Sequence, residues 1–200
     1  MIVYVETNFV LELAYLRATS DHCQHLLDLA RDHEIQIVVS SFALIEARLA
    51  WQRNAKRRNR LHSAVRTELG ELSRSRPLTD IPLQSQAFVA ALIATAQQDR
   101  ERLETAINTL ARVGTVTVTP PATLARAYEV EHRIGLSPQD ALVYASVVEH
   151  IQSNSSPEKL FVTQNRRDFL VVEDELARHG CKLVFTFDAA EGYVRSKMAT

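Results

Sequence analysis

The stretch Ile2-Val3-Tyr4-Val5-Glu6-Thr7-Asn8 joins a short apolar run to an acid at its end. Apolar runs without polar alternation are typical of strands that are buried on both faces of a parallel sheet. Similar runs predict four more strands, at 35–39, 115–118, 160–163 and 182–187. Helical patterns lie between these runs, and strands that alternate with helices indicate an α/β fold with a mostly parallel sheet of about five strands.

The helices are predicted from apolar residues at three- and four-residue spacing. Asp21 is the expected N-cap of the second helix, and Gly114 is expected to end the fourth helix. Pro77 and Pro82 are expected to interrupt the long helical region between the second and third strands. The predicted helices span 8–18, 21–33, 41–73, 84–112, 121–134, 138–151 and 169–178.

Length and composition predict one globular domain over residues 1–200. The chain is 46% hydrophobic and 24% charged, and the long helices near 50–112 are expected to form a projecting arm or insertion. A net charge of -1 argues against a strongly basic nucleic-acid-binding coat. The two cysteines, Cys23 and Cys181, cannot build a disulfide framework, which favours a cytoplasmic location. No signal peptide or membrane-spanning run is predicted.

Four acids are expected at one edge of the sheet. Glu6 ends the first strand, Glu46 lies one turn into the helix after the second, Asp140 lies in the first turn of a helix, and Asp168 follows the fourth strand. Ligands of open parallel sheets bind outside the carboxyl ends of the strands. Because clustered carboxylates repel one another, they favour a bound cation, and oxygen ligands favour Mg²⁺ or Mn²⁺. Such ions polarise phosphodiesters and activate water.

Each acid also has a purely structural interpretation. Glu6 could be a strand-end acid near a helix N-terminus, and Glu46 could be paired within an apolar turn. Asp140 could complete a capping box with Ser137, which is compatible with a second role as a ligand. Asp168 could be an N-cap, and Asn165 competes with it for the fourth place in the site.

The chain resembles the PIN-domain nucleases, including toxin ribonucleases of bacterial toxin–antitoxin systems, over about 1–50 and 115–187. The resemblance rests on four segments: Val5-Glu6-Thr7-Asn8, Ser41-Phe42-Ala43-Leu44-Ile45-Glu46, Leu136-Ser137-Pro138-Gln139-Asp140-Ala141-Leu142-Val143-Tyr144-Ala145 and Phe161-Val162-Thr163-Gln164-Asn165-Arg166-Arg167-Asp168-Phe169. It implies a PIN-like three-layer α/β/α sandwich and divalent-metal-dependent cleavage of RNA. A protein antitoxin and a homodimer are partners that the resemblance implies.

The resemblance also implies roles for individual residues. Glu46 and Asp140 match metal-site positions, and Asp168 matches a late acid with Asn165 and Thr163 nearby. Asn8 matches the polar residue that supports the first acid. Glu6 stands where the family usually has Asp, and its extra methylene moves the carboxylate by about 1.5 Å, compared with the ~0.5 Å tolerance of a catalytic site. The segment near 50–112 is longer than in a compact toxin.

A basic stretch follows Glu46 on the same predicted helix. Arg53, Lys56, Arg57 and Arg60 share a helical face, which could track an RNA backbone or could be an ordinary solvated surface. His22, Cys23 and His25 form a second small cluster of ligand types. Zinc is not predicted there, because the sequence shows no third or fourth partner.

Two functions from different classes follow from these residues. The first is an endoribonuclease in which Glu6, Glu46, Asp140 and Asp168 hold Mg²⁺ or Mn²⁺ and serve as the catalytic residues. The alternative is a weakly active or inactive PIN-like module that binds RNA or protein. Glu6 and the long arm favour the module, and the pattern at Glu46, Asp140 and Asp168 favours the enzyme.

Overall fold

Five parallel strands form one sheet at the centre of the structure, a computed structural model that describes residues 1–74 and 81–199, without the side chains of 81–84. The sheet order is β3-β2-β1-β4-β5. The strands are β1 (Ile2–Val5), β2 (Gln36–Ser40), β3 (Thr115–Thr117), β4 (Lys159–Val162) and β5 (Cys181–Val184). All four pairings are parallel, with Val3 opposite Ile37 and Tyr4 opposite Phe161.

The sheet order places a topological switch beside β1. The chain first adds β2 and β3 on one side of β1, and then returns to add β4 and β5 on the other. Since β1 pairs with both β2 and β4, the carboxyl ends of these three strands are neighbours. This is the position at which open parallel sheets form their ligand crevice.

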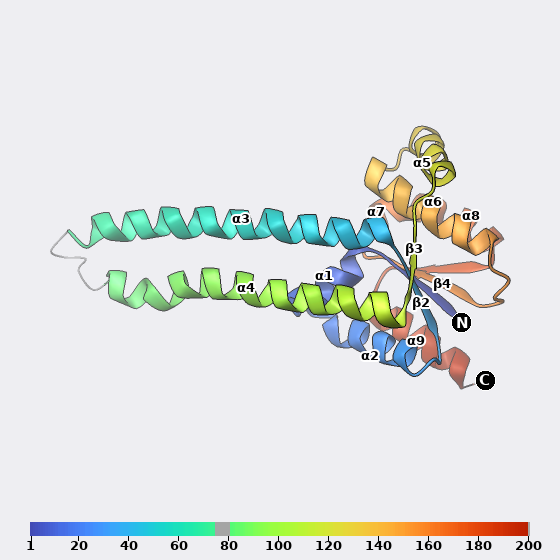
Figure 1. Ribbon diagram of the computed structural model, residues 1–200, viewed down its shortest axis with the longest axis horizontal. Helices are drawn as coiled ribbons and strands as arrows, with labels where there is room; N and C mark the ends of the chain where they lie inside the picture. The colour runs from blue at the N-terminus through green and yellow to red at the C-terminus, as the bar shows by residue number, and fades with distance from the viewer. Residues whose placement is uncertain (75–80, 200) are drawn as a thin grey trace.

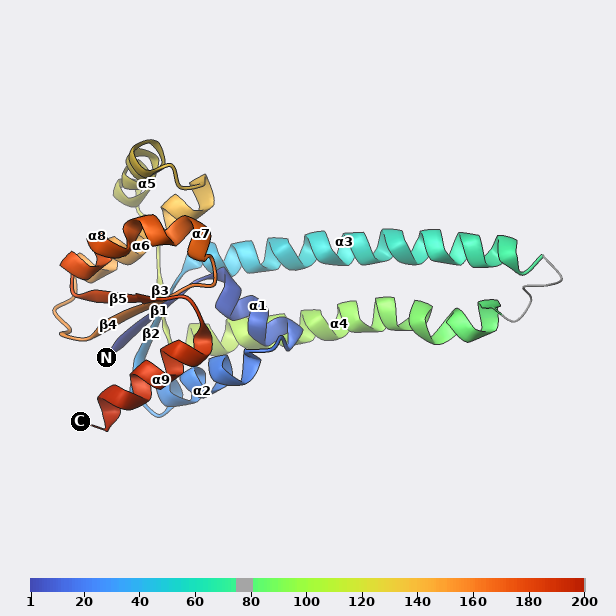
Figure 2. The ribbon, with the colours of Figure 1, turned by 180° about the vertical axis from the view of Figure 1, so that it is seen from behind.

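Helices cover both faces of the sheet, which confirms the predicted three-layer α/β/α sandwich (Figures 1 and 2). Alternate residues of β1 point to opposite faces. Val3 and Val5 pack in one core with α1 (Thr7–Tyr15), α2 (Ser20–Arg31) and α9 (Phe187–Met198). Ile2 and Tyr4 pack in the other core, with residues of α5 (Pro121–Ile134), α6 (Pro138–Gln152), α7 (Arg166–Phe169) and α8 (Glu173–Arg178).

Two long helices, α3 (Ser41–Leu72) and α4 (Ile81–Val113), lie side by side and project from the sandwich (Figure 1). The base of α4 is anchored, because Leu103 and Leu110 are buried in the core that contains α1. Along the arm, Asp99 of α4 is almost fully buried and receives Arg58 of α3 and Arg102 of α4, each at 2.5 Å. Phe88, farther out on α4, is exposed.

Gly114 separates α4 from β3, as the sequence predicts. A Cβ atom at this position would lie 2.9 Å from the carbonyl oxygen of Leu110 and 3.1 Å from that of Ile37. Both atoms belong to backbone, so a side chain could be placed here only if the helix end moved away from β2. The lack of a side chain at Gly114 therefore allows the end of α4 to lie close to β2.

Several predicted boundaries differ from the structure. Asp21 is not the N-cap of α2, because the helix begins at Ser20 with Thr19 as its cap, and Asp21 lies in the first turn instead. Pro82 does not precede α4 but lies in its first turn, where a proline removes no helical hydrogen bond, and Pro77 lies outside the described residues. The segment 169–178 is divided among the end of α7, the 3-10 helix η2 (Leu170–Val172) and α8.

The end of the chain also differs from the prediction. β5 ends at Val184, and helix α9, which the sequence did not predict, begins at Phe187. The hydroxyl of Thr186 accepts a hydrogen bond from the backbone N–H of Ala189 at 3.4 Å, so Thr186 is an N-cap rather than a strand residue. Within the described residues, no helix has both the length and the apolar character needed to cross a membrane.

Candidate active site

Glu6 lies at the junction between β1 and α1. Its side chain caps α1: one carboxylate oxygen accepts the backbone N–H of Asn8 at 2.9 Å, and the other accepts the Asn8 side-chain amide at 2.8 Å. Only 6% of the residue is exposed. The pKa of Glu6 is raised to about 7, mainly by burial and to a smaller extent by the charge of Glu46, against the opposing effect of hydrogen bonds from Asn8 and Thr163. Asn8 thus donates to Glu6 from both its backbone and its side chain.

Glu46 reaches the same edge of the sheet from α3. Ser40, the last residue of β2, caps this helix by accepting the backbone N–H of Ala43 at 3.1 Å. Glu46 is half-buried, and the hydroxyl of Thr7 donates a hydrogen bond to its carboxylate. Since Thr7 directly follows Glu6, the start of α1 carries one of these acids and binds the other. The sequence analysis did not assign Thr7 a role, because only the folded chain shows that it meets Glu46.

Asp140 lies in the first turn of α6, where Ser137 is the N-cap, as predicted, but Asp140 bonds the hydroxyl of Ser137 rather than its backbone N–H, so the predicted capping box forms only in part. The backbone N–H of Asp140 donates to the Ser137 hydroxyl at 3.2 Å, and that hydroxyl donates to an Asp140 carboxylate oxygen at 2.6 Å. The other carboxylate oxygen accepts the side-chain amide of Asn165 at 3.2 Å. Thr163, at the end of β4, accepts the backbone N–H of Asn165 at 3.0 Å. Asp140 is therefore tied to the loop after β4.

Asp168 is less closely integrated with the other acids. It lies in the first turn of α7, which begins at Arg166, so it is not the N-cap that its structural interpretation required. Its side chain is half-buried. Among the described residues, no hydrogen bond or ion pair joins Asp168 to Glu6, Glu46 or Asp140, whereas Asn165 contacts Asp140 directly. The geometry favours Asn165 over Asp168 as the residue next to Asp140.

The electrostatic setting of Glu6 differs from that of the other buried acids. Glu12 is paired with Arg17, Asp99 with Arg58 and Arg102, and Glu191 with Arg195 and two histidines. Within residues 1–74 and 81–199, no ion pair involves Glu6, Glu46, Asp140 or Asp168. A buried carboxylate without a cation is costly unless it is protonated. In the part of the chain that the structure describes, no side-chain cation is therefore paired with the acids of the sheet edge.

The donor chemistry at this edge fits a hard divalent cation. Glu6, Glu46 and Asp140 offer carboxylate oxygens, and Thr163 and Asn165 add neutral oxygens nearby. In the described structure these acids do not draw together into a group of three with donor atoms within 4.8 Å of one another; His22, His25 and Glu191 do. Cation binding at the sheet edge would therefore require the hydrogen-bonded carboxylates to turn toward a common centre.

The predicted basic stretch lies along α3 beyond Glu46. Arg53, Lys56, Arg57 and Arg60 are all exposed, and no ion pair with another described residue involves them. Seven residues make almost two turns of a helix, so Arg53 and Arg60 follow Glu46 on nearly the same side of α3. Arg58 points to the other helix of the arm, where it meets Asp99. The exposed charges thus continue outward from the acidic edge.

Comparison with known proteins identifies the family. The family model described as a PIN domain matches residues 3–169, which include Glu6, Glu46, Asp140 and Asp168. No curated protein and no solved structure matches the chain with significance. The matched range spans most of the chain and includes both helices of the arm. The chain therefore belongs to the PIN-domain family, whose fold is a nuclease fold.

Proposed function

We propose that this protein is a divalent-metal-dependent endoribonuclease whose metal site is formed by Glu6, Glu46 and Asp140, with Asn165, rather than Asp168, beside Asp140. The observation that carries the proposal is the buried carboxyl of Glu6, which has no cationic partner among the described residues, whereas Glu12, Asp99 and Glu191 each have one. A bound Mg²⁺ or Mn²⁺ would supply that charge, since both ions prefer oxygen ligands.

Hydrogen bonds hold the acids in place without an ion, and the carboxylates would turn from these positions when an ion binds. Asn8 orients Glu6, Thr7 orients Glu46, and Asn165 orients Asp140. Outer hydrogen-bonding partners of this kind fix ligand orientation in metal sites. Since Glu6 has a pKa of about 7, it holds a proton through much of the acidic range and has to release it when a cation binds. Metal affinity should therefore rise with pH.

The bound ion would polarise a phosphodiester and lower the pKa of water enough to make it a nucleophile at neutral pH. The chain's own contribution is to hold the carboxylates at the topological switch, beside the carboxyl ends of β1 and β4. Glu6, buried at the end of β1, keeps its carboxylate away from bulk water, which strengthens its interaction with a cation.

The arm gives the proposed site a path for an extended strand. Arg53, Arg57 and Arg60 lie on roughly the same side of α3 as Glu46, over about 20 Å of helix. Unpaired exposed guanidinium groups bind phosphates without reading sequence. We therefore infer that single-stranded RNA lies along α3 with its scissile phosphodiester at the acidic edge.

A second candidate function has its own support. Both oxygens of Glu6 and both oxygens of Asp140 already accept hydrogen bonds within the chain. A carboxylate whose two oxygens both accept hydrogen bonds can have a purely structural role at the start of a helix. The alternative function is therefore a PIN-like module that binds RNA or protein without cleaving it.

Single-turnover cleavage of labelled single-stranded RNA separates the two functions. The proposal predicts cleavage with Mn²⁺ and no cleavage with a chelator. In Asp140→Asn, the single-turnover cleavage rate should fall by about tenfold to a hundredfold. Asp174→Asn is the matched control, since Asp174 is an exposed first-turn aspartate of α8. RNA binding without Mn²⁺-dependent cleavage would favour the module, and equal cleavage by wild type and Asp140→Asn would remove the acidic edge from the reaction.

A further inference from the structure

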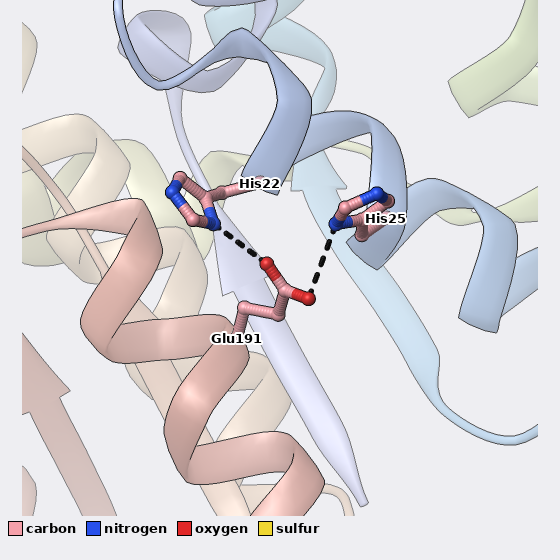
Figure 3. Close-up of side chains that lie close together, drawn as sticks. All are labelled: His22, His25 and Glu191. Atoms are coloured by element: carbon pink, nitrogen blue, oxygen red, sulfur yellow. Dashed lines mark hydrogen bonds and ion pairs between the residues drawn. The ribbon is translucent and has the colours of Figure 1, made fainter.

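Two histidines of α2 and one acid of α9 converge on the face of the sandwich that carries these helices. His22 Nδ1 lies 2.6 Å from one carboxylate oxygen of Glu191, and His25 Nδ1 lies 3.1 Å from the other. Figure 3 shows both imidazole rings pointing to the carboxylate. One donor atom from each residue lies within 4.8 Å of the others. The third partner that the sequence lacked beside His22 and His25 is therefore supplied by a distant helix.

We propose that His22, His25 and Glu191 form a second metal site, which takes a transition-metal ion of the Zn²⁺ type and is separate from the acidic edge of the sheet. The donor set carries the choice of ion. Imidazole nitrogen suits Zn²⁺ and its transition-metal neighbours, whereas Mg²⁺ and Mn²⁺ prefer sites built from oxygen alone. Two histidines and one glutamate are a known combination of Zn²⁺ ligands.

The distances between the two histidine nitrogens and the Glu191 oxygens have to change only slightly for a metal ion to bind. Zn²⁺ binds nitrogen and oxygen at about 2.0–2.2 Å, so tetrahedral ligand atoms lie about 3.4 Å apart. The two nitrogen–oxygen distances at Glu191 have to lengthen by less than about 1 Å, which a rotation of the carboxylate or the imidazoles supplies. His22 and His25 are three residues apart and lie on the same side of α2, so the backbone does not need to move.

Burial differs among the three ligands in a way that suits an ion. The Glu191 side chain is 9% exposed, whereas those of His22 and His25 are 40% and 52% exposed. The carboxylate is thus held in place while the solvent side stays open for ion entry and for a water ligand. Cys23, between the two histidines, is fully buried in the core and does not take part.

Charged neighbours act in opposite directions on this cluster. Arg195, one turn after Glu191, binds the same carboxylate with two of its nitrogens, at 2.7 and 2.6 Å. Its side chain is 61% exposed, so it can turn into solvent or keep one oxygen while the ion takes the other. Asp188, one turn before Glu191, lies near enough to His22 for the two to interact electrostatically. Asp188 offsets part of the positive charge of Arg195 and is a candidate outer ligand.

Zn²⁺ titration by calorimetry tests the proposal, with untagged protein in excess Mg²⁺ so that the oxygen-only acids are occupied. We expect one Zn²⁺ per chain, with affinity more than about tenfold weaker in His22→Gln and in His25→Gln. His132→Gln is the matched control, because His132 is an exposed histidine of α5 remote from this cluster. Its Zn²⁺ affinity should equal that of the wild type.

Arg195→Gln provides a test that leaves all three ligands in place. Removing the guanidinium frees the Glu191 carboxylate, so Zn²⁺ affinity should rise. The variants at the exposed histidines keep the core intact, and their far-ultraviolet circular dichroism should match that of the wild type. A wild-type protein that binds no Zn²⁺, or a His22→Gln variant that binds it as tightly as the wild type, would overturn the proposal and leave the cluster as an ion-paired contact between α2 and α9.

Discussion

The negative charge of Glu46, on α3, is one of the causes that raise the pKa of the buried Glu6 carboxyl at the end of β1. The two side chains are also connected through the backbone, since Thr7 follows Glu6 and donates its hydroxyl to Glu46. A cation bound by both acids would offset their mutual repulsion and also the free-energy cost of burying the charged Glu6 carboxylate.

The first prediction concerns the pH dependence of stability without metal. The folded pKa of Glu6 is about 7, against an ordinary value of 4.5. Between these values folded Glu6 keeps its proton and unfolded Glu6 loses it, so the free energy of unfolding falls as pH rises through this window. The total contribution is on the order of 3 kcal/mol, at 1.36 kcal/mol per pKa unit. Urea unfolding at pH 5 and pH 7.5 in a chelator measures it.

The Glu6→Gln variant should lose most of this pH-dependent fall, because glutamine stays neutral throughout. Glu129→Gln, which changes an exposed residue of α5, is the control and should keep the wild-type dependence. If the free energy of unfolding changes by the same amount between the two pH values in the wild type and in Glu6→Gln, the pKa of Glu6 is not raised in the folded protein.

The second prediction compares Asn165 with Asp168. Asn165 donates to Asp140 and is anchored by Thr163, whereas Asp168 has no such link to the other acids in the described structure. Asn165→Ala should therefore reduce Mn²⁺-dependent cleavage by about tenfold or more, and Asp168→Asn by less. Cleavage rates at saturating Mn²⁺ measure both effects. The reverse order would place Asp168 next to the metal and Asn165 outside it.

The third prediction uses two exposed arginines of the same helix. Arg60 lies on roughly the same side of α3 as Glu46, and Arg66 lies on roughly the opposite side. Arg60→Gln should weaken single-stranded RNA binding and lower the slope of log affinity against log salt by about 0.7, while Arg66→Gln should change neither. Binding at four or more salt concentrations measures the slopes. Equal effects of the two variants would mean that the arm attracts RNA only through its overall charge.

The fourth prediction concerns the attachment of the arm. Asp99 is 4% exposed and neutralises Arg58 and Arg102, which are themselves about one third exposed. Asp99→Ala should destabilise the protein by about 3 kcal/mol, because removing one partner of a buried ion pair leaves the other charges uncompensated. Urea unfolding measures the loss. Asp99→Asn, which keeps hydrogen-bonding capacity, should cost less, and a cost below about 1 kcal/mol for both variants would contradict this role.

The sandwich could be predicted because its strands carry unambiguous patterns. Ile2–Val5 is apolar at every position, as a strand covered on both faces has to be, and the chain order of strands and helices then implies a parallel sheet. The last segment was harder to assign. Leu183, Phe185 and Phe187 alternate with Lys182, Val184 and Thr186, which resembles one strand, but Thr186 caps a helix instead. Gly192 within α9 weakens the helical pattern further.

The acids at the sheet edge could be located from sequence because the ends of parallel strands share one edge. Their partners could not be located in this way. Thr7 contacts Glu46 only because α3 packs beside α1, and Asn165 contacts Asp140 only because α6 and the loop after β4 meet. Likewise, Glu191 reaches His22 and His25 through the packing of α9 on α2. Such contacts depend on tertiary packing, which local spacing does not encode.

Mn²⁺ affinity measured by calorimetry for wild type, Glu6→Gln and Glu6→Asp tests the account most directly, because the uncompensated carboxyl of Glu6 carries it. The account predicts that the wild type binds Mn²⁺ and that Glu6→Gln binds at least about tenfold more weakly, since a hard anionic ligand is lost. Glu6→Asp should retain binding, because the charge remains and only its position changes. An identical Mn²⁺ affinity for the wild type and Glu6→Gln would contradict the account.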